Sequence, residues 1–129
     1  VDLESMNRDH ADQVEMVNAV VEALDKLDGS EASVRAVDEA VEDFTEHTTE
    51  HFRHEEDEMT KFKFPAFQIH KAEHDRAIER MRMVTAQWAT DRDADAIRPY
   101  FERHFPAWLI GHVSAMDAVS AQFVSGHPR

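Results

Sequence analysis

The sequence contains no cysteine, which excludes disulfide bonds and thiolate metal sites. This absence fits a reducing compartment, so we expect a cytoplasmic protein. No stretch approaches the roughly 20 consecutive apolar residues of a membrane-spanning helix. No signal peptide is visible either, and we therefore expect no membrane among the binding partners.

Glycine and proline are also scarce, with three and four residues among 129, and this scarcity favours long helices over a turn-rich β fold. The length suits a single domain, residues 1–129, with one core. Positively charged residues are few, with 14 lysines and arginines against 27 aspartates and glutamates. The formal net charge of −13 repels nucleic acid, which we do not expect as a partner.

Apolar residues recur every three or four positions along four segments, as in amphipathic helices. We expect these helices over about residues 3–27, 31–61, 65–89 and 95–125. Gly29 suits a left-handed helix end and Ser30 the next N-cap. Pro106 should kink or break the last helix, whereas Pro99 is tolerable if it lies in the first turn. Four helices with short connections predict an all-α, up-down-up-down four-helix bundle.

Nine histidines are many for this length, and each of the four apolar stripes contains at least one. The histidines on the stripes are His10, His51, His70, His74 and His112. The first stripe is completed by Val14, Val17, Val21 and Leu24. A lone histidine on an apolar face is usually a core residue with a hydrogen-bond partner, but five of them would need five separate buried partners. Their convergence predicts a metal site in the core of the bundle.

The spacing of the ligand candidates supports this interpretation. His51 and Glu55 are four residues apart, as are His70 and His74, so each pair lies on one face of its helix. Two imidazoles one turn apart can hold one ion. Glu55, on a facing helix, can then bridge to a second ion held by His51 and His10.

Two points stay open at this stage. Asp117 follows His112 by five residues, about 140° around a helix, so periodicity alone does not select it as a ligand. Imidazole and carboxylate ligands also accept several metals, so zinc or manganese could occupy such a site in a given preparation.

The motifs resemble those of the hemerythrin family, in its bacterial single-domain form. The matching segments are Asp9-His10 with Asn18, His51-Phe52 through Met59, Phe64-Pro65 with His70 and His74, and Trp108-Leu109 with His112 and Asp117. Phe64 stands where the family usually has tyrosine, and Pro106 just ahead of Trp108 is unusual.

The resemblance implies a pair of iron ions (Fe2+/Fe3+) with a bridging oxo or hydroxo group. The implied ligands are His70, His74 and His112 on one iron, His10 and His51 on the other, and Glu55 and Asp117 as bridges. The iron held by His10 and His51 keeps one open position, where dioxygen would bind. Leu109 matches the family leucine that lies over the bound oxygen. We expect its companions in the pocket wall among Val14, Thr48, Phe52 and Val113.

The leading hypothesis is reversible dioxygen binding, for storage, transport or sensing, with no catalytic residue. The five histidines are neutral, and less negative charge than in carboxylate-rich di-iron bundles favours the ferrous state. An alternative is an enzyme with peroxidase-like or iron-oxidising activity at the same centre. A third is an oxygen-sensing module of a longer signalling protein, whose other domains would be its partners; the first residue is Val, not Met.

The remaining charged residues and histidines are expected outside the ligand set. Glu56 and Glu58 should be surface charges. His47, one turn before His51, should lie near the mouth of the site or in a partly buried structural position. The histidines expected to face solvent are His54, His104 and His127.

Overall fold

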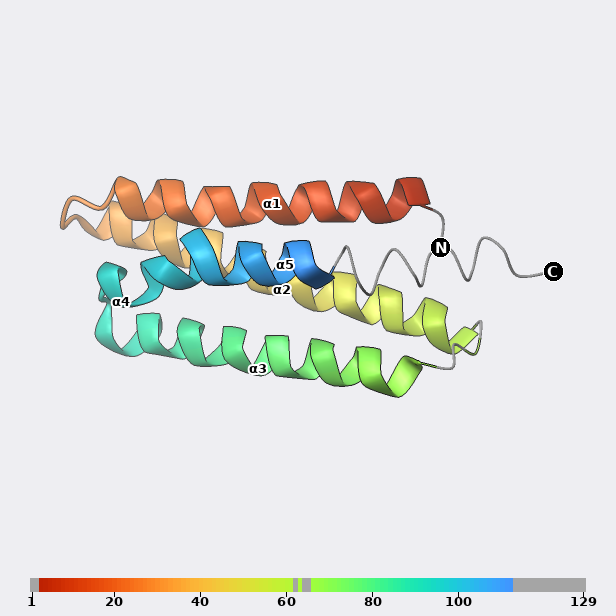
Figure 1. Cartoon of the computed structure of the whole chain (residues 1–129). Coiled ribbons are helices and arrows are strands. Elements are labelled where there is room, and N and C mark those ends of the chain that lie inside the picture. The colour runs from red at the N-terminus through yellow and green to blue at the C-terminus, as the bar shows by residue number, and fades with distance from the viewer. Residues whose placement is uncertain (1–2, 62, 64–65, 113–129) are drawn as a thin grey trace.

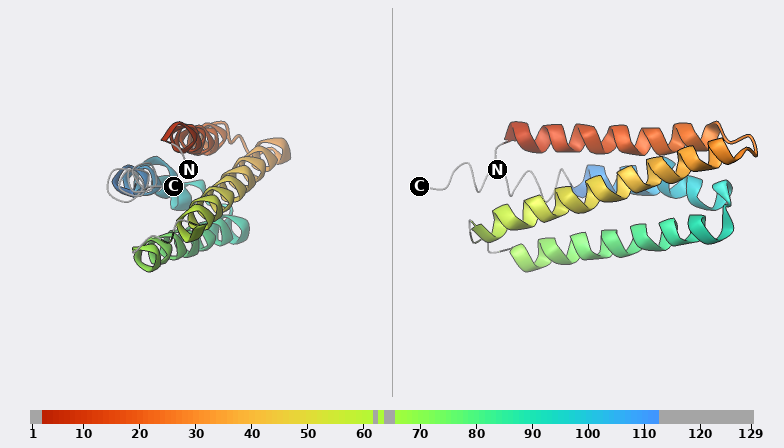
Figure 2. Two further views of the ribbon diagram at one scale, coloured as in Figure 1. Left: turned by 90° about the vertical axis from the view of Figure 1, so that its right-hand side faces the viewer. Right: turned by 180° about the vertical axis from the view of Figure 1, so that it is seen from behind.

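A computed structural model describes residues 3–61, 63 and 66–112. Its helices are α1 (Leu3–Asp25), α2 (Glu31–Lys61), α3 (Phe67–Asp91), α4 (Ala94–Pro99) and α5 (Phe105–His112), with a π-helical segment η1 (Tyr100–His104) between the last two. The first three helices alternate in direction, and α4, η1 and α5 together form the fourth rod (Figure 1; end and rear views in Figure 2). The predicted all-α, up-down-up-down bundle is confirmed, and no strand occurs among the described residues.

The turn between α1 and α2 follows the expected capping pattern. Gly29 has a positive φ of 86°, which glycine adopts without steric cost. Ser30 Oγ accepts the backbone N–H of Ser33 at 3.1 Å and so caps α2. In the same way Asp93 caps α4 by accepting the N–H of Asp95. Within the described ranges, no helix has the length and apolar character that a bilayer crossing requires.

The expected break at Pro106 is replaced by a widened turn ahead of it. Pro106 lies in the first turn of α5, where its missing N–H is tolerated. The irregularity falls in η1, where the N–H of Phe105 bonds to the C=O of Tyr100, five residues back. Pro99 is not in the first turn of its helix but at its last residue. The fourth rod therefore continues through both prolines and brings His112 opposite His74 of α3.

The interior divides into two halves along the bundle. The apolar half is centred on Phe44, whose ring meets Phe101 at 5.2 Å and Phe105 at 4.9 Å between centroids. It comprises Val20, Leu24, Val37, Val41, Phe44, Trp88, Ile97, Tyr100, Phe101 and Phe105, all buried. The histidine half comprises His10, His51, Glu55, His70, His74 and His112.

The register of α1 differs from the sequence expectation. Gln13 and Val20 are 0% exposed, whereas Val14 is 49% exposed and Val21 is half-buried. Between His10 and Val17, helical geometry allows either residue 13 or residue 14 to face inward. An apolar pattern selects Val14 rather than Gln13. The placement of Val14 on the buried stripe is therefore wrong, and a polar side chain lies there instead.

Candidate metal centre

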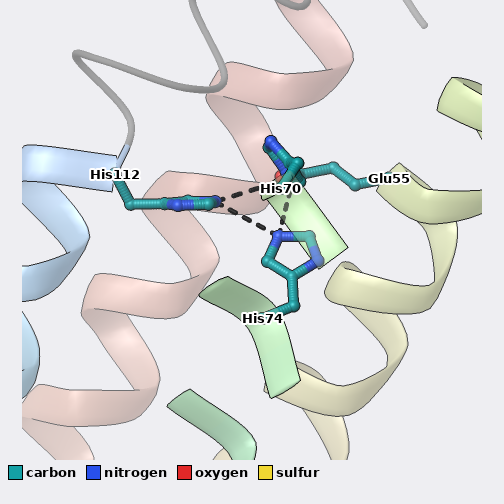
Figure 3. Close-up of side chains that lie close together, drawn as sticks. All are labelled: Glu55, His70, His74 and His112. Atoms are coloured by element: carbon teal, nitrogen blue, oxygen red, sulfur yellow. Dashed lines mark hydrogen bonds and ion pairs between the residues drawn. The ribbon is translucent and has the colours of Figure 1, made fainter. Parts of the chain in front are cut away.

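The histidine half is assembled from all four rods at one end of the bundle. The side chains are His10 from α1, His51 and Glu55 from α2, His70 and His74 from α3, and His112 from α5. They meet because α1 and α3 start from the end of the bundle toward which α2 and α5 run (Figure 1). Figure 3 shows Glu55, His70, His74 and His112 pointing toward one another from their helices. The structure thus brings together six of the seven residues that the sequence analysis named as metal ligands.

Three histidines surround one oxygen of Glu55. Glu55 Oε1 lies 2.8 Å from His70 Nε2, 3.1 Å from His74 Nε2 and 3.8 Å from His112 Nε2. The Nε2 atoms of His74 and His112 are 3.2 Å apart. Two ligand atoms about 2.1 Å from one ion, at right angles, would be about 3.0 Å apart. These separations therefore fit donor atoms that share one metal ion.

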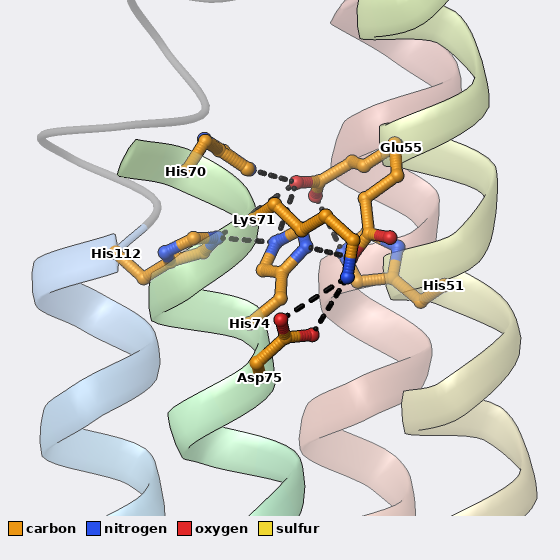
Figure 4. A network of polar contacts seen from close by, with 8 residues as sticks. His51, Glu55, His70, Lys71, His74, Asp75 and His112 are labelled. Carbon is orange, nitrogen blue, oxygen red and sulfur yellow. Dashed lines mark hydrogen bonds and ion pairs between the residues drawn. The ribbon is translucent and has the colours of Figure 1, made fainter. Parts of the chain in front are cut away.

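The second oxygen of Glu55 faces the other cluster, formed with His10 and His51. Glu55 Oε2 is buried and lies 2.9 Å from His51 Nε2, a contact without hydrogen-bond geometry, and no described residue donates a hydrogen bond to it. The rings of His10 and His51 meet edge-on at 5.1 Å. One carboxylate thus turns an oxygen toward each of two histidine clusters, as a ligand between two metal ions would. Figure 4 shows Glu55 between His51 on one side and His70, His74 and His112 on the other.

The electrostatics of Glu55 keep it in the form that binds metal. Burial raises the pKa of this carboxyl, but the ring nitrogens of His112, His51, His70 and His74 outweigh burial and hold the pKa well below its usual range. Among the residues whose burial the structure describes (10–61, 63 and 66–112), Glu55 is also the only buried carboxylate. An ionised carboxylate surrounded by imidazoles is a donor set for a divalent or trivalent transition-metal ion.

Glu56 orients one of these imidazoles, although we expected it to be a surface charge. Its Oε2 lies 2.8 Å from His74 Nδ1, and its side chain is only 21% exposed. When Nδ1 carries the proton and donates it to Glu56, Nε2 keeps a lone pair that points at Glu55 and His112. The surface assignment of Glu56 is therefore wrong. The sequence alone does not show which glutamate beside Glu55 contacts the site, because the contact depends on His74 of α3 lying opposite Glu56.

Two aromatic rings hold imidazoles of the cluster face to face. Phe52 stacks on His74 with ring centroids 4.1 Å apart and an interplanar angle of 3°. Trp108 stacks on His112 at 4.5 Å and 13°. Each stack restricts rotation of an imidazole about its side-chain bonds, so the donor nitrogens have little freedom to turn away from Glu55.

The residues expected around the open position are only partly where the sequence placed them. Thr48, Phe52 and Leu109 are buried, at 1%, 3% and 5% exposure. Val14, at 49% exposure, cannot wall a buried pocket, so that expectation is wrong. Gln13 takes the inward position on α1, three residues after His10, and the apolar pattern gave no signal for it.

Other expectations lie beyond the ligand cluster. Phe64, Pro65, Val113, Asp117 and His127, which the sequence analysis named, lie outside the described ranges. His54 and His104 are exposed, as expected. His47 is half-buried, with its ring parallel to that of His51 at 6.4 Å. His47 therefore sits beside the cluster as an outer layer on α2.

Comparison with known proteins gives a consistent result along the chain. The family described as "Hemerythrin HHE cation binding domain" matches residues 1–122. The chain is similar to the bacteriohemerythrin of Aquifex aeolicus (strain VF5), at 28% identity over 117 residues, which cover 91% of this chain and 86% of that protein. It is also similar to the bacteriohemerythrin of Stenotrophomonas maltophilia (strain R551-3), at 27% identity over 111 residues, covering 84% and 70%. No solved structure matches it.

Proposed function

The chain belongs to the hemerythrin family, and from this premise we propose that it binds dioxygen reversibly at a pair of iron ions. The observation that carries the proposal is the position of Glu55, whose two oxygens face two separate histidine clusters. The names of the two bacteriohemerythrin relatives support the same function.

In this proposal the ligands divide between two ions. His70, His74 and His112 would hold one iron, His10 and His51 would hold the other, and Glu55 and Asp117 would complete the ligand set of both. The separations among the nitrogens and oxygens of the first set support a shared ion, and imidazole is a suitable ligand for iron. The role of Asp117 rests on the family motif alone.

The iron pair, when bound, supplies the electrons that dioxygen takes up on binding and returns on release. The side chains of this chain keep that exchange reversible. Phe52 and Leu109, both buried, exclude water from the centre. Glu56 holds the proton of His74 on Nδ1, away from the ligand nitrogen. Five imidazole ligands leave the centre with little negative charge, which favours the reduced state over the high-valent iron of oxidising enzymes.

The test is an optical spectrum of the reduced, iron-loaded protein under argon, after air, and again under vacuum. We expect two irons per chain and a visible band that appears in air, fades under vacuum and returns in air. His74→Ala should abolish the band, whereas His104→Ala, a change at an exposed histidine, should not. A band that never reverses, or sustained consumption of hydrogen peroxide over many turnovers, would replace this proposal with the enzyme alternative.

A further inference from the structure

A polar pair lies directly beside the cluster of His10 and His51. Gln13 Nε2 donates a hydrogen bond to Thr48 Oγ1 at 2.7 Å, and the two side chains are 0% and 1% exposed. Gln13 follows His10 by three residues on α1, and Thr48 precedes His51 by three on the antiparallel α2. The bond therefore crosses the interface between α1 and α2 about one helical turn, or roughly 5 Å, from the two histidines.

The pair has hydrogen-bonding capacity that the described residues do not use. Gln13 Oε1 is buried, and no residue in the described part of the chain donates a hydrogen bond to it. If the amide is turned over, Oε1 accepts the Thr48 hydroxyl proton and both N–H groups become free instead. In either orientation the amide keeps at least one N–H for another acceptor. Burying such a group without a partner is costly, which implies that a polar ligand completes the pair.

The position of the pair indicates which ligand it would meet. Leu109 precedes His112 by three residues on α5, as Thr48 precedes His51 on α2, so Leu109 lies in the same layer of the bundle. This layer adjoins the iron that His10 and His51 would hold, on which the family resemblance implies one open position. Its side chains from α1 and α2 are an amide and a hydroxyl rather than two apolar groups.

We propose that Gln13, held in place by Thr48, donates a hydrogen bond to a small ligand at the iron position of His10 and His51. The site would therefore favour ligands with a hydrogen-bond-accepting atom, small anions above all. This inference rests on the proposed function, because it requires iron at His10 and His51. Its new element is the assignment of Gln13, which is not among the proposed metal ligands, as the residue that positions this ligand.

The test uses azide, a small anion that binds ferric ions, titrated into the oxidised, iron-loaded protein and followed by visible absorption. Gln13→Leu removes the amide at similar volume and should weaken azide binding by at least about tenfold, the loss of one hydrogen bond to a charged group. Thr48→Val should also weaken binding, whereas Thr48→Ser, which keeps the hydroxyl, should restore it. Gln87→Leu makes the same chemical change at an exposed position of α3 and should leave the affinity unchanged.

The outcomes separate this inference from the function on which it rests. If the parent takes up no iron pair, both fall. If the parent binds two irons and dioxygen reversibly but Gln13→Leu has unchanged azide affinity, only the inference is overturned. A purely structural brace would instead lower the melting temperature of Gln13→Leu and leave azide affinity intact. Should Gln13→Leu fail to load iron, equal azide affinities of Thr48→Val and Thr48→Ser would overturn the inference.

Discussion

The two halves of the bundle are built on the same four rods and are similarly buried, yet they differ in what fills them. In the apolar half, Phe44 is surrounded by the rings of Tyr100, Phe101 and Phe105. In the histidine half, five imidazoles surround the buried carboxylate of Glu55. Removal of apolar surface from water stabilises the first half directly. The second half buries polar groups and gains its full stability only when a ligand pairs them.

The single helix α2 shows how this difference is encoded. Its buried stripe begins with Val37, Val41 and Phe44 and continues in the same register with Thr48, His51 and Glu55. The backbone and the helical period are the same in both parts, and only the side-chain chemistry changes. We therefore expect the apolar half to act as the scaffold on which the histidine half is assembled. The predictions below separate these two roles.

The largest effect is expected from Phe44→Ala. Phe44 is completely buried among aromatic rings, and truncating such a residue costs about 3–5 kcal/mol. Because Phe44 lies in the apolar half, the loss in free energy of unfolding should be the same with and without iron. Chemical denaturation of both forms measures it. Met83→Ala, at a position that is 67% exposed, is the control, and a loss confined to the iron-loaded form would contradict the scaffold role.

Leu109→Ala should affect both halves, because Leu109 packs on the apolar cluster and lies one turn before His112. The cavity should cost about 2–5 kcal/mol if the site is fully packed. It should also admit water and speed the decay of the oxygenated form, which the visible band follows. Ile110→Ala, 69% exposed on the same helix, should leave the decay unchanged. If the oxygenated form of Leu109→Ala decays no faster than that of the parent, Leu109 contributes only to packing.

Glu56→Ala should weaken the histidine half alone. The change removes the acceptor of the His74 Nδ1 hydrogen bond, and loss of such a partner typically costs 10–100-fold in metal affinity. Competition with a chelator measures that affinity. Asp57→Ala removes the same charge at the next, exposed position and should have little effect. Equal affinities for the two variants would show that Glu56 acts only through its charge.

The smallest effect is expected at the far end of the apolar half. Burial raises the pKa of Asp38, but hydrogen bonds from Trp88 and Arg92 and the Arg92 charge outweigh it, so the pKa lies below its ordinary value. A lowered folded-state pKa contributes stability above the unfolded pKa of about 3.9, and that stability is lost as pH falls through the folded pKa.

Asp38→Asn should therefore cost about 0.2–1 kcal/mol at neutral pH, since the Asp38–Arg92 pair is partly exposed. It should also flatten the decrease in stability below about pH 4. Thermal melts across pH 2–7 measure both quantities, with Glu39→Gln at an exposed neighbouring position as the control. If the stability of Asp38→Asn falls below pH 4 as steeply as that of the parent, Asp38 does not contribute to acid stability.

Much of the fold could be predicted from the sequence because its apolar stripes are strongly periodic. The predicted bounds of α2 match those observed, and those of α1 and α3 lie within two residues. The fourth rod was harder, because proline interrupts the helical hydrogen-bond pattern without indicating that a π-helical turn will absorb the defect. Pro106 therefore predicted a kink or a break, whereas the helical chain continues through Pro106 and its irregularity is the π-helical turn just before it.

The site residues were predictable where they lie on the apolar stripe of their own helix. They were not predictable where their role depends on a contact with another helix. His51 and Glu55 occupy inward positions that their helix alone defines. Glu56 became visible only through His74, which lies on α3. Gln13 was missed because hydropathy assigns glutamine to the surface, although helix geometry allows it to face inward.

The most direct test of the central claim is hydrogen exchange, together with melting, of the iron-free and iron-loaded protein. We predict that removing iron lowers the melting temperature and speeds exchange of the backbone amides around His10, His51 and His70. Iron at 100–1,000 times its dissociation constant would supply about 2.7–4.1 kcal/mol. Amides around Phe44 and Val20 should stay protected in the iron-free form until global unfolding. Equal melting temperatures and equal exchange in the histidine half of the two forms would contradict the claim that this half is built around bound metal.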